Sequence, residues 1–284
     1  MEISTVAVIG VGTIGSSVVA DLVIHGFKVI AVDVSDEALE NAKGIIRDAV
    51  RFAPMLDPKL RGKANSKQLE NIEYTTCLED IHSCDFVIEN VSEKWSIKEG
   101  VYGRLEEICS EDVIFGVNTS CLSITKIGGL TNRSANVIGM HFMNPSYLKP
   151  VIEVMRGFHT SDECVQRVDG FLTKMDKTSV VVNDFPGFVS NRVSHLFMNE
   201  AAFVVQDQVA DPGQVDAIFR DCFGHKMGPL ETADLIGLDT VVDSLEVLYE
   251  TYQDSKFRCC PILKKMVEAG LLGKKSGKGF FDYS

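Results

Sequence analysis

Residues 5–33 decide the fold class, and they read TVAVIGVGTIGSSVVADLVIHGFKVIAVD. A β-branched run over 5–9 leads into three closely spaced glycines. Apolar residues at helical spacing follow over 14–25, and a second apolar run covers 28–32. This order predicts a strand, a tight turn, a helix and a second strand. Such a unit joins two parallel strands of one sheet.

The rest of the chain divides into two parts. Further strands are expected at 86–89, 113–117, 137–141, 151–155 and 179–182, with helices between them that include 95–108 and 162–175. After the stretch NDFPG at 183–187 the pattern becomes helical, at 188–206, 212–222, 230–252 and 261–269. We therefore expect an α/β Rossmann-type domain with a mostly parallel sheet at 1–184, and an all-α domain at 185–284.

Composition limits the function classes. The chain has 284 residues, of which 45% are hydrophobic and 24% charged, as in globular proteins. Its net charge of −12 disfavours nucleic acid as a partner. No apolar run approaches the roughly 20 residues of a membrane span, and the first residues lack the basic start of a secretory signal. The eight cysteines form no C-x-x-C pair, so reduced thiols in the cytoplasm are expected, and the histidines predict no metal site.

The glycine-rich turn predicts a dinucleotide site. The pattern G-x-G-x-x-G directly follows a strand and opens a helix, which is the context that a pyrophosphate needs. Asp33 ends the second strand, where a carboxylate accepts ribose hydroxyls and repels a 2′-phosphate, so NAD is expected rather than NADP. The alternative is a glycine turn that binds no nucleotide. The cofactor-binding residues expected here are Gly10, Gly12, Thr13, Ile14, Gly15 and Asp33.

Two further residues suggest acid–base chemistry. His141 ends a strand, in GMHFMNP, and Glu153 lies within the apolar run VIEV. A carboxylate in a buried run is costly without a partner, and a histidine at a strand end is a suitable one. Together they would form a general base with a stabilised imidazolium. A purely structural histidine is the alternative.

Each of the other polar residues allows two interpretations. Ser120, in NTS, either bonds a substrate oxygen or caps a helix that begins near Ser123. Asn191, in PGFVSNR, is either a site residue or part of an exposed helix face. Glu89, Glu93 and Lys98 either surround the site or form a solvated helix start.

Several motifs together resemble the 3-hydroxyacyl-CoA dehydrogenase family across essentially the whole chain. They occur in the family's order: VIGVGTIG, DFVIENVSE, NTSCLSI, GMHFMNP, DFPGFVSNR, KMGPLETADLIGLDT and GKKSGKGFFDY. The resemblance implies an NAD-binding domain, a helical dimerisation domain and oxidation of a hydroxyacyl thioester in fatty acid metabolism. It implies that His141 is the catalytic base, that Glu153 is its partner, and that Ser120 and Asn191 help to hold substrate and histidine. It also implies nicotinamide-side contacts from Glu93, Lys98, Ser120 and Asn144.

The chain departs from the family in two segments. The family usually follows H-F-F-N-P with V-P-V-M-K-L-V-E-V, whereas this chain has SYLKPVIEV at 146–154. Tyr147 and Lys149 are thus expected near the acyl group, where a lysine would disfavour long alkyl chains or would point to solvent instead. The family also covers coenzyme A with a helical hairpin, and the corresponding stretch at 55–74 is shorter here.

The prediction of the substrate therefore has alternatives. A short 3-hydroxyacyl-CoA, such as 3-hydroxybutyryl-CoA, is the first. A polar hydroxyacyl group on an acyl carrier protein, as in polyketide extender-unit synthesis, is the second. A crystallin-like relative without turnover and a free sugar-acid dehydrogenase are further alternatives. A homodimer formed through the helical domain is also expected.

Overall fold

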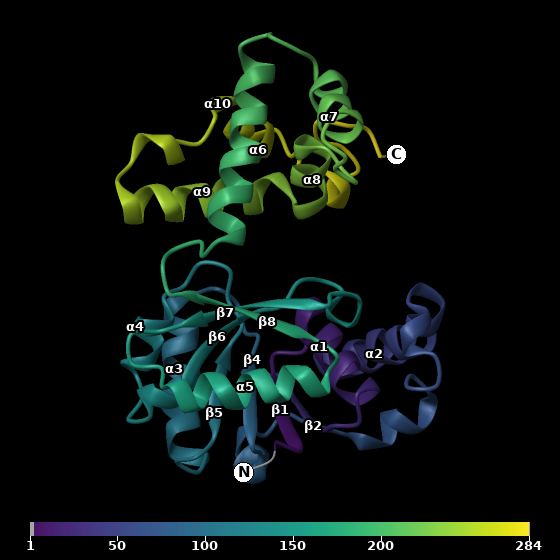
Figure 1. The fold of residues 1–284 in the computed structure, drawn as a ribbon, viewed down its shortest axis with the longest axis vertical. Helices are drawn as coiled ribbons and strands as arrows, with labels where there is room; N and C mark the ends of the chain where they lie inside the picture. The colour runs from purple at the N-terminus through teal and green to yellow at the C-terminus, as the bar shows by residue number, and fades with distance from the viewer. Residues whose placement is uncertain (1–2, 284) are drawn as a thin grey trace. The chain divides into compact units, whose positions relative to one another are not determined.

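The computed structural model describes residues 3–283, and the chain divides into two compact units, at Met1–Phe185 and Pro186–Ser284. The first unit contains an eight-stranded sheet with the order β3-β2-β1-β4-β5-β6-β7-β8 (Figure 1). Its strands are β1 (Thr5–Ile9), β2 (Lys28–Val32), β3 (Ile72–Thr75), β4 (Phe86–Glu89), β5 (Ile114–Val117), β6 (Val137–His141), β7 (Val151–Arg156) and β8 (Thr178–Asn183). The strands β1 to β6 are parallel, β7 is antiparallel to β6, and β8 is parallel to β7. The expected α/β class with a mostly parallel sheet is confirmed.

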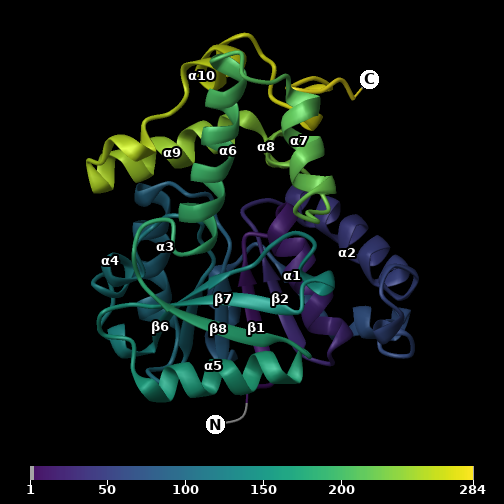
Figure 2. The ribbon, with the colours of Figure 1, turned by 45° about the horizontal axis from the view of Figure 1, so that its top comes forward.

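Helices cover both faces of this sheet. Its helices are α1 (Thr13–Ile24), α2 (Asp36–Leu56), α3 (Trp95–Ile108), α4 (Ile124–Gly128) and α5 (Asp162–Lys174). One core joins α1, α2 and α5 to alternate strand residues, with Phe86 stacked on Phe171 of α5. On the other face Phe115 meets Tyr102 of α3. Figures 1 and 2 show α5 across one face of the strands and α2 at the β2–β3 side. Residues 6–9 of β1, 86–88 of β4 and 114–117 of β5 are buried on both faces and form continuous apolar runs.

One strand of this unit was not predicted from the sequence. It is β3, whose residues 72–75 are only half-buried and lack a continuous apolar run. After α2 the chain forms only two 3₁₀-helices, Pro58–Leu60 and Ser66–Asn71, before it enters β3. No second α-helix follows α2 within residues 57–71, so the segment forms no α-helical hairpin.

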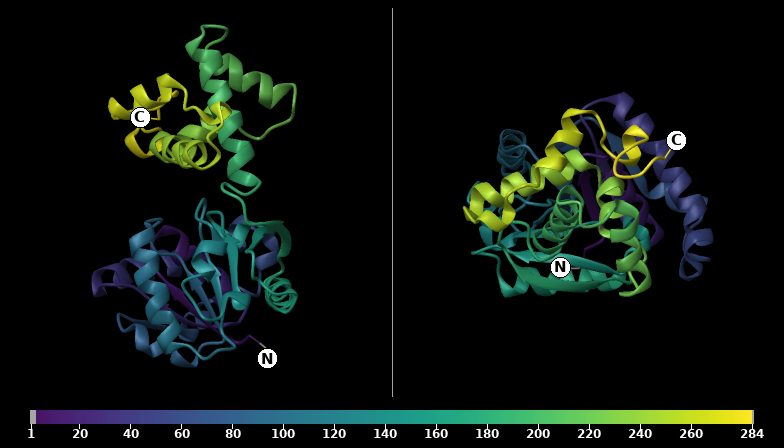
Figure 3. Two further views of the ribbon diagram at one scale, coloured as in Figure 1. Left: turned by 90° about the vertical axis from the view of Figure 1, so that its left-hand side faces the viewer. Right: turned by 90° about the horizontal axis from the view of Figure 1, so that it is seen from above.

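The second unit is helical. Its α-helices are α6 (Ser190–Gln206), α7 (Pro212–Asp221), α8 (Pro229–Ile236), α9 (Leu238–Tyr252) and α10 (Pro261–Glu268). Helix α6 packs against each of the other four (Figure 3). The single helix predicted at 230–252 is wrong, because Gly237, with φ of 104°, separates α8 from α9. Only glycine adopts that backbone conformation without strain.

Among residues 3–283, no helix is long and apolar enough to cross a membrane. All eight cysteines are free thiols. No group of three or more His, Cys, Asp or Glu side chains among the described residues is arranged to hold a metal ion.

Candidate active site

The glycine turn between β1 and α1 leaves room for a ligand at one position and requires close packing at two others. Gly10 has φ of 82°, and a Cβ there would lie 2.9 Å from the Asn90 carbonyl oxygen. A Cβ on Gly15 would lie 1.9 Å from the Gly10 carbonyl oxygen, so α1 can approach the turn this closely only if residue 15 is glycine. Gly12, the N-cap of α1, has open space where its Cβ would be. The turn therefore fits a pyrophosphate, which would lie against Gly12 at the helix N-terminus.

Asp33 lies directly beside this turn. Its Oδ2 accepts a hydrogen bond from the Val11 amide at 2.8 Å, and its Oδ1 accepts one from the Val34 amide at 2.7 Å. The side chain remains partly exposed. Since each carboxylate oxygen accepts two hydrogen bonds, capacity for ribose hydroxyls remains. The expected ribose contact is thus sterically open, and the carboxylate also stabilises the turn.

His141 and Glu153 face each other across two antiparallel strands. They are directly opposite in the β6–β7 register, and His141 Nδ1 lies 3.2 Å from Glu153 Oε2. Both residues are more than nine-tenths buried. Directly opposite residues on an antiparallel pair have adjacent side chains, so two residues that are twelve positions apart in the sequence come into contact. The carboxylate can orient the ring and stabilise its protonated form.

Ser120 contacts the other nitrogen of the same ring. Its Oγ lies 3.3 Å from His141 Nε2. Glu93 holds the loop that carries it, since Glu93 Oε1 accepts from the Ser120 amide at 2.5 Å and Oε2 from Thr119 Oγ1 at 2.9 Å. The helix-cap alternative for Ser120 is wrong, because Ser123 caps α4 by accepting from the Lys126 amide.

Glu89 and Lys98 are not a solvated helix start. Both are fully buried, with Lys98 Nζ 2.8 Å from each carboxylate oxygen and 3.2 Å from the Asn118 carbonyl oxygen. Tyr102 OH and the Val91 amide also donate to Glu89. Burial raises the pKa of Glu89, while the Lys98 ammonium opposes that shift. The Lys98 side chain is thus enclosed by protein, and a direct cofactor contact from its ammonium has no support in this geometry.

Two asparagines connect the strand ends. Asn118 Nδ2 donates to Asn90 Oδ1 at 2.6 Å, and Asn118 Oδ1 accepts from the Phe142 amide at 3.1 Å. Phe142 directly follows His141, so this link fixes the chain as it leaves β6. The role of Asn90 was not predicted from the sequence. The signal was its position directly after β4, at the same sheet edge as Asn118.

The remaining predicted residues differ in exposure and in the unit that carries them. Asn144 and Lys149 are exposed. Tyr147 does not extend freely from its loop but packs against the core beneath α1, where burial and the Asp21 carboxylate raise its pKa. The expectation of Tyr147 beside the acyl group is therefore unsupported, since its ring serves the domain core. Asn191 belongs to the second unit, in the first turn of α6.

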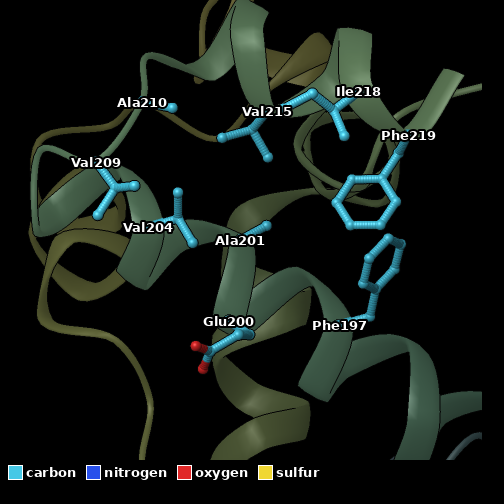
Figure 4. A pocket seen from close by; sticks show the side chains of 9 residues that line it. All are labelled: Phe197, Glu200, Ala201, Val204, Val209, Ala210, Val215, Ile218 and Phe219. Carbon is cyan, nitrogen blue, oxygen red and sulfur yellow. The ribbon is translucent and has the colours of Figure 1, made fainter. Parts of the chain in front are cut away.

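The second unit contains an apolar pocket of about 260 Å³ between α6, α7 and the loop that joins them (Figure 4). Its lining is Phe197, Glu200, Ala201, Val204, Val209, Ala210, Val215, Ile218 and Phe219. With one carboxylate and no other polar side chain in this lining, the pocket offers little to acid–base chemistry.

Comparison with known proteins decides the family. Residues 5–185 match the model of the 3-hydroxyacyl-CoA dehydrogenase NAD-binding domain, and residues 187–283 match that family's C-terminal domain. The chain belongs to the 3-hydroxyacyl-CoA dehydrogenase family. It is an oxidoreductase, and its cofactor is NAD.

Individual relatives agree with this assignment. A probable 3-hydroxybutyryl-CoA dehydrogenase of Bacillus subtilis is 43% identical over 284 residues, which is 100% of this chain and 98% of the relative. A 3-hydroxyadipyl-CoA dehydrogenase of Escherichia coli is 33% identical over all of this chain and 60% of its own length. The crystal structure of (S)-3-hydroxybutyryl-CoA dehydrogenase from Ralstonia eutropha superposes with a TM-score of 0.94, at 34% identity and full coverage of both chains.

Proposed function

We propose that this chain oxidises a short 3-hydroxyacyl-CoA, such as 3-hydroxybutyryl-CoA, to the 3-oxoacyl-CoA, and catalyses the reverse reduction. The observation that carries the proposal is the buried His141–Glu153 pair with Ser120 at the second ring nitrogen. Relatives named 3-hydroxybutyryl-CoA dehydrogenase align over nearly their full length.

His141 is assigned as the general base. With the Glu153 carboxylate at Nδ1, the favoured neutral tautomer carries its proton on Nδ1 and leaves Nε2 to accept the substrate hydroxyl proton. NAD, when bound, accepts the hydride from the hydroxyl-bearing carbon. Glu153 stabilises the resulting imidazolium. In the reverse direction His141 returns the proton to the ketone oxygen.

Ser120 and Glu93 are assigned to alignment. The Ser120 hydroxyl shares the Nε2 side of His141, where it can hold a substrate oxygen. Glu93 fixes the Ser120 backbone, and Glu89 with Lys98 fixes the neighbouring strand end through the Asn118 carbonyl. We also assign Asn191 and Asn144 to the site from the family motifs.

The thioester carrier is the second part of the proposal. Exposed basic side chains follow α2 in an otherwise acidic protein, at Lys59, Arg61 and Lys67. They suit the phosphates of coenzyme A. The short 3₁₀ segment also keeps an acyl carrier protein as a candidate, since such a partner needs a less enclosed surface.

The test is NADH formation from (S)-3-hydroxybutyryl-CoA against the same acyl group on an acyl carrier protein. We expect higher kcat/KM with the coenzyme A thioester. Higher kcat/KM with the carrier-bound group would replace the substrate assignment, and turnover of neither would reject the proposed function. Glu153→Gln should lower kcat severely, whereas Glu163→Gln, at an exposed position on α5, serves as the matched control.

Partner and compartment complete the proposal. We infer a homodimer formed through the helical unit, whose apolar pocket and exposed Val209, Ile218 and Phe223 provide apolar surface. Eight free thiols suit a reducing compartment such as the cytoplasm.

A further inference from the structure

The segment between His141 and Glu153 is attached to α1 by a buried polar cluster. The cluster consists of Ser17 and Asp21 on α1, Ser146 in the segment, and Lys177 just before β8. Their exposed fractions are 4%, 0%, 0% and 7%. Ser146 and its neighbours are where the sequence departs from the family's usual V-P-V-M pattern. The departure therefore coincides with a built polar contact.

We call these four residues the Asp21 cluster. Asp21 and Lys177 form its charged centre. Lys177 Nζ lies 2.9 Å from Asp21 Oδ2, and Ser146 Oγ donates to the same oxygen at 2.5 Å. The ammonium also donates to the carbonyl oxygens of Ser146 at 2.9 Å and Lys149 at 2.8 Å. The Ser146 amide donates to Ser17 Oγ at 2.7 Å. All three ammonium protons thus have acceptors, as a buried lysine requires.

The contacts connect two parts of the site. Ser17 and Asp21 are four residues apart on α1 and therefore share one helix face. That helix opens at the glycine turn. On the other side of the Asp21 cluster, both ends of the stretch 146–149 are held, and Asn144 is two residues from Ser146. The cluster therefore links the NAD-binding helix to the chain that follows the catalytic histidine.

The dyad itself does not need this link. The β6–β7 register places His141 opposite Glu153 by backbone pairing alone. Between the two strands, the Phe142 amide donates to the Asn118 side chain, and the Pro150 carbonyl oxygen accepts from the Thr178 amide at 2.8 Å, so the ends of this segment are held but not its middle. The position of this middle part relative to α1 depends on the Asp21 cluster and on the packing of Tyr147.

We propose that Asp21, Ser146 and Lys177 are positioning residues for hydride transfer, which fix the segment 144–149 against the NAD-binding helix. This inference rests on the proposed function. Misplacement by about 1 Å can lower a rate by about 100-fold, so an anchor of this kind has a measurable role in turnover.

The test compares variants that remove the charges together or one at a time. Asp21→Asn leaves the buried Lys177 ammonium without its carboxylate. Lys177→Met leaves the buried Asp21 carboxylate with Ser146 Oγ and His25, whose Nδ1 lies 3.3 Å from Asp21 Oδ1, so both variants should shift the urea midpoint downward. The double variant Asp21→Asn/Lys177→Met removes both charges with side chains of similar size, and its midpoint should be nearer that of the unmodified protein. It still lacks the ammonium that holds the Ser146 and Lys149 carbonyls. The control is Glu163→Gln, at an exposed position on α5.

Four measurements separate positioning from stability. They are kcat and KM with acetoacetyl-CoA and NADH, the NADH dissociation constant, the primary isotope effect with NADH deuterated at the transferred position, and hydrogen–deuterium exchange of residues 142–150. For the double variant we expect kcat about tenfold to 100-fold lower. The NADH dissociation constant should change by less than about threefold. The isotope effect should be equal to or larger than that of the unmodified protein, and exchange in 142–150 should be faster.

The outcomes are distinct. A double variant with kcat within about twofold of the unmodified protein, or with a suppressed isotope effect, overturns the positioning role. Unchanged exchange in 142–150 overturns it as well, and this readout needs no activity. If Glu163→Gln lowers kcat as much as the double variant, the effect is not specific to the Asp21 cluster. If the unmodified protein fails to reduce acetoacetyl-CoA, the proposed function fails instead, whatever the variants do.

Discussion

The carboxylates around the site differ in what they contact, and these contacts indicate the role of each one. Glu153 lies against one nitrogen of His141, whereas Glu93 binds backbone and hydroxyl donors beside Ser120. Glu89 is paired with Lys98 out of contact with solvent. Asp33 remains partly exposed next to the glycine turn. Under the proposed function, we expect the carboxylate paired with a histidine to support proton transfer, and those bound by backbone amides or an ammonium to fix the position of their neighbours.

The first prediction concerns the general base. His141→Gln should lower kcat by about 10²–10⁴-fold, because the glutamine side chain cannot take up the hydroxyl proton. NADH binding, followed by fluorescence titration, should remain within a few-fold of the unmodified protein. His159→Gln, at an exposed position of the same unit, is the control and should keep its activity. Near-normal turnover by the His141 variant would remove it from the base role.

The second prediction concerns cofactor choice. Asp33→Ala should weaken NAD binding and relax the preference for NAD over NADP, because the carboxylate both supports the turn and repels a 2′-phosphate. The measurement is kcat/KM with each cofactor at one fixed substrate concentration. Comparable efficiency of the unmodified protein with NADP would contradict the assigned role of Asp33.

Elements fix what single residues cannot. The register of β6 against β7 decides that His141 meets Glu153, and a slip by one residue would turn one of them to the opposite face. The approach of α1 to β1 depends on Gly15, which leaves no room for a side chain. Strand β1 is also held at its start, where Asp85 accepts from the Ser4 amide, the Ser4 hydroxyl and the Thr5 amide, each at 2.9 Å.

The third prediction separates packing from binding within the glycine turn. Gly15→Ala should lower the free energy of unfolding by several kcal/mol, because its Cβ would overlap the Gly10 carbonyl oxygen. Gly12→Ala has φ of −64° and open space around the new Cβ, so its unfolding midpoint should stay near normal while NAD affinity falls. Urea unfolding and NADH titration on both variants test this. Equal losses of stability would refute the distinction.

The fourth prediction concerns the start of β1 and β4. Burial acts to raise the pKa of Asp85, but hydrogen bonds from Thr5 and Ser4 outweigh it and hold that pKa below its usual value. The unfolded chain therefore takes up this proton first as pH falls, and the stabilisation present at neutral pH is lost as pH drops from about 4 through the folded pKa. Asp85→Ala should cost about 1–3 kcal/mol at pH 7 and less at pH 3.

Urea unfolding at the two pH values measures the effect of Asp85→Ala. Asp112→Ala, which changes an exposed aspartate of the same unit, is the control. An Asp85 variant whose loss of stability is the same at both pH values would contradict the assigned protonation effect.

The whole molecule combines a nucleotide-binding sheet with a helical unit, and the family models match them in turn. The helical unit has about 100 residues and a small core of its own, centred on α6, α8 and α9. A unit of that size buries a limited share of its surface, and an apolar pocket remains on it. Self-association would bury more of this apolar surface.

The fifth prediction is therefore a homodimer. Light scattering at micromolar concentration should give twice the mass of the chain. Val209→Glu places a charge in the lining of the pocket at a 76% exposed position and should shift the protein toward monomer if this face forms the interface. Phe158→Glu, exposed in the first unit, is the control. A monomeric unmodified protein would refute the prediction.

The sequence by itself determined the features that depend on local order. Strand, glycine turn, helix and acidic strand end lie within residues 5–33, so their spacing predicts the nucleotide site without knowledge of distant residues. The family motifs occur in the family's order along the whole chain, and they indicated the family without knowledge of contacts between distant residues. Helix limits such as Trp95–Ile108 also followed, since apolar periodicity is a local signal.

Only the tertiary structure decided which distant side chains meet. Burial of Lys98 with Glu89, packing of Tyr147 on the core and attachment of Ser146 to Asp21 depend on partners up to 125 residues away. A residue's polarity gives no indication whether a partner will satisfy it inside the fold, so exposed and buried readings stayed equally open in the sequence. Sheet register and helix packing resolved them, because they place strand ends and the face of α1 within hydrogen-bond distance of each other.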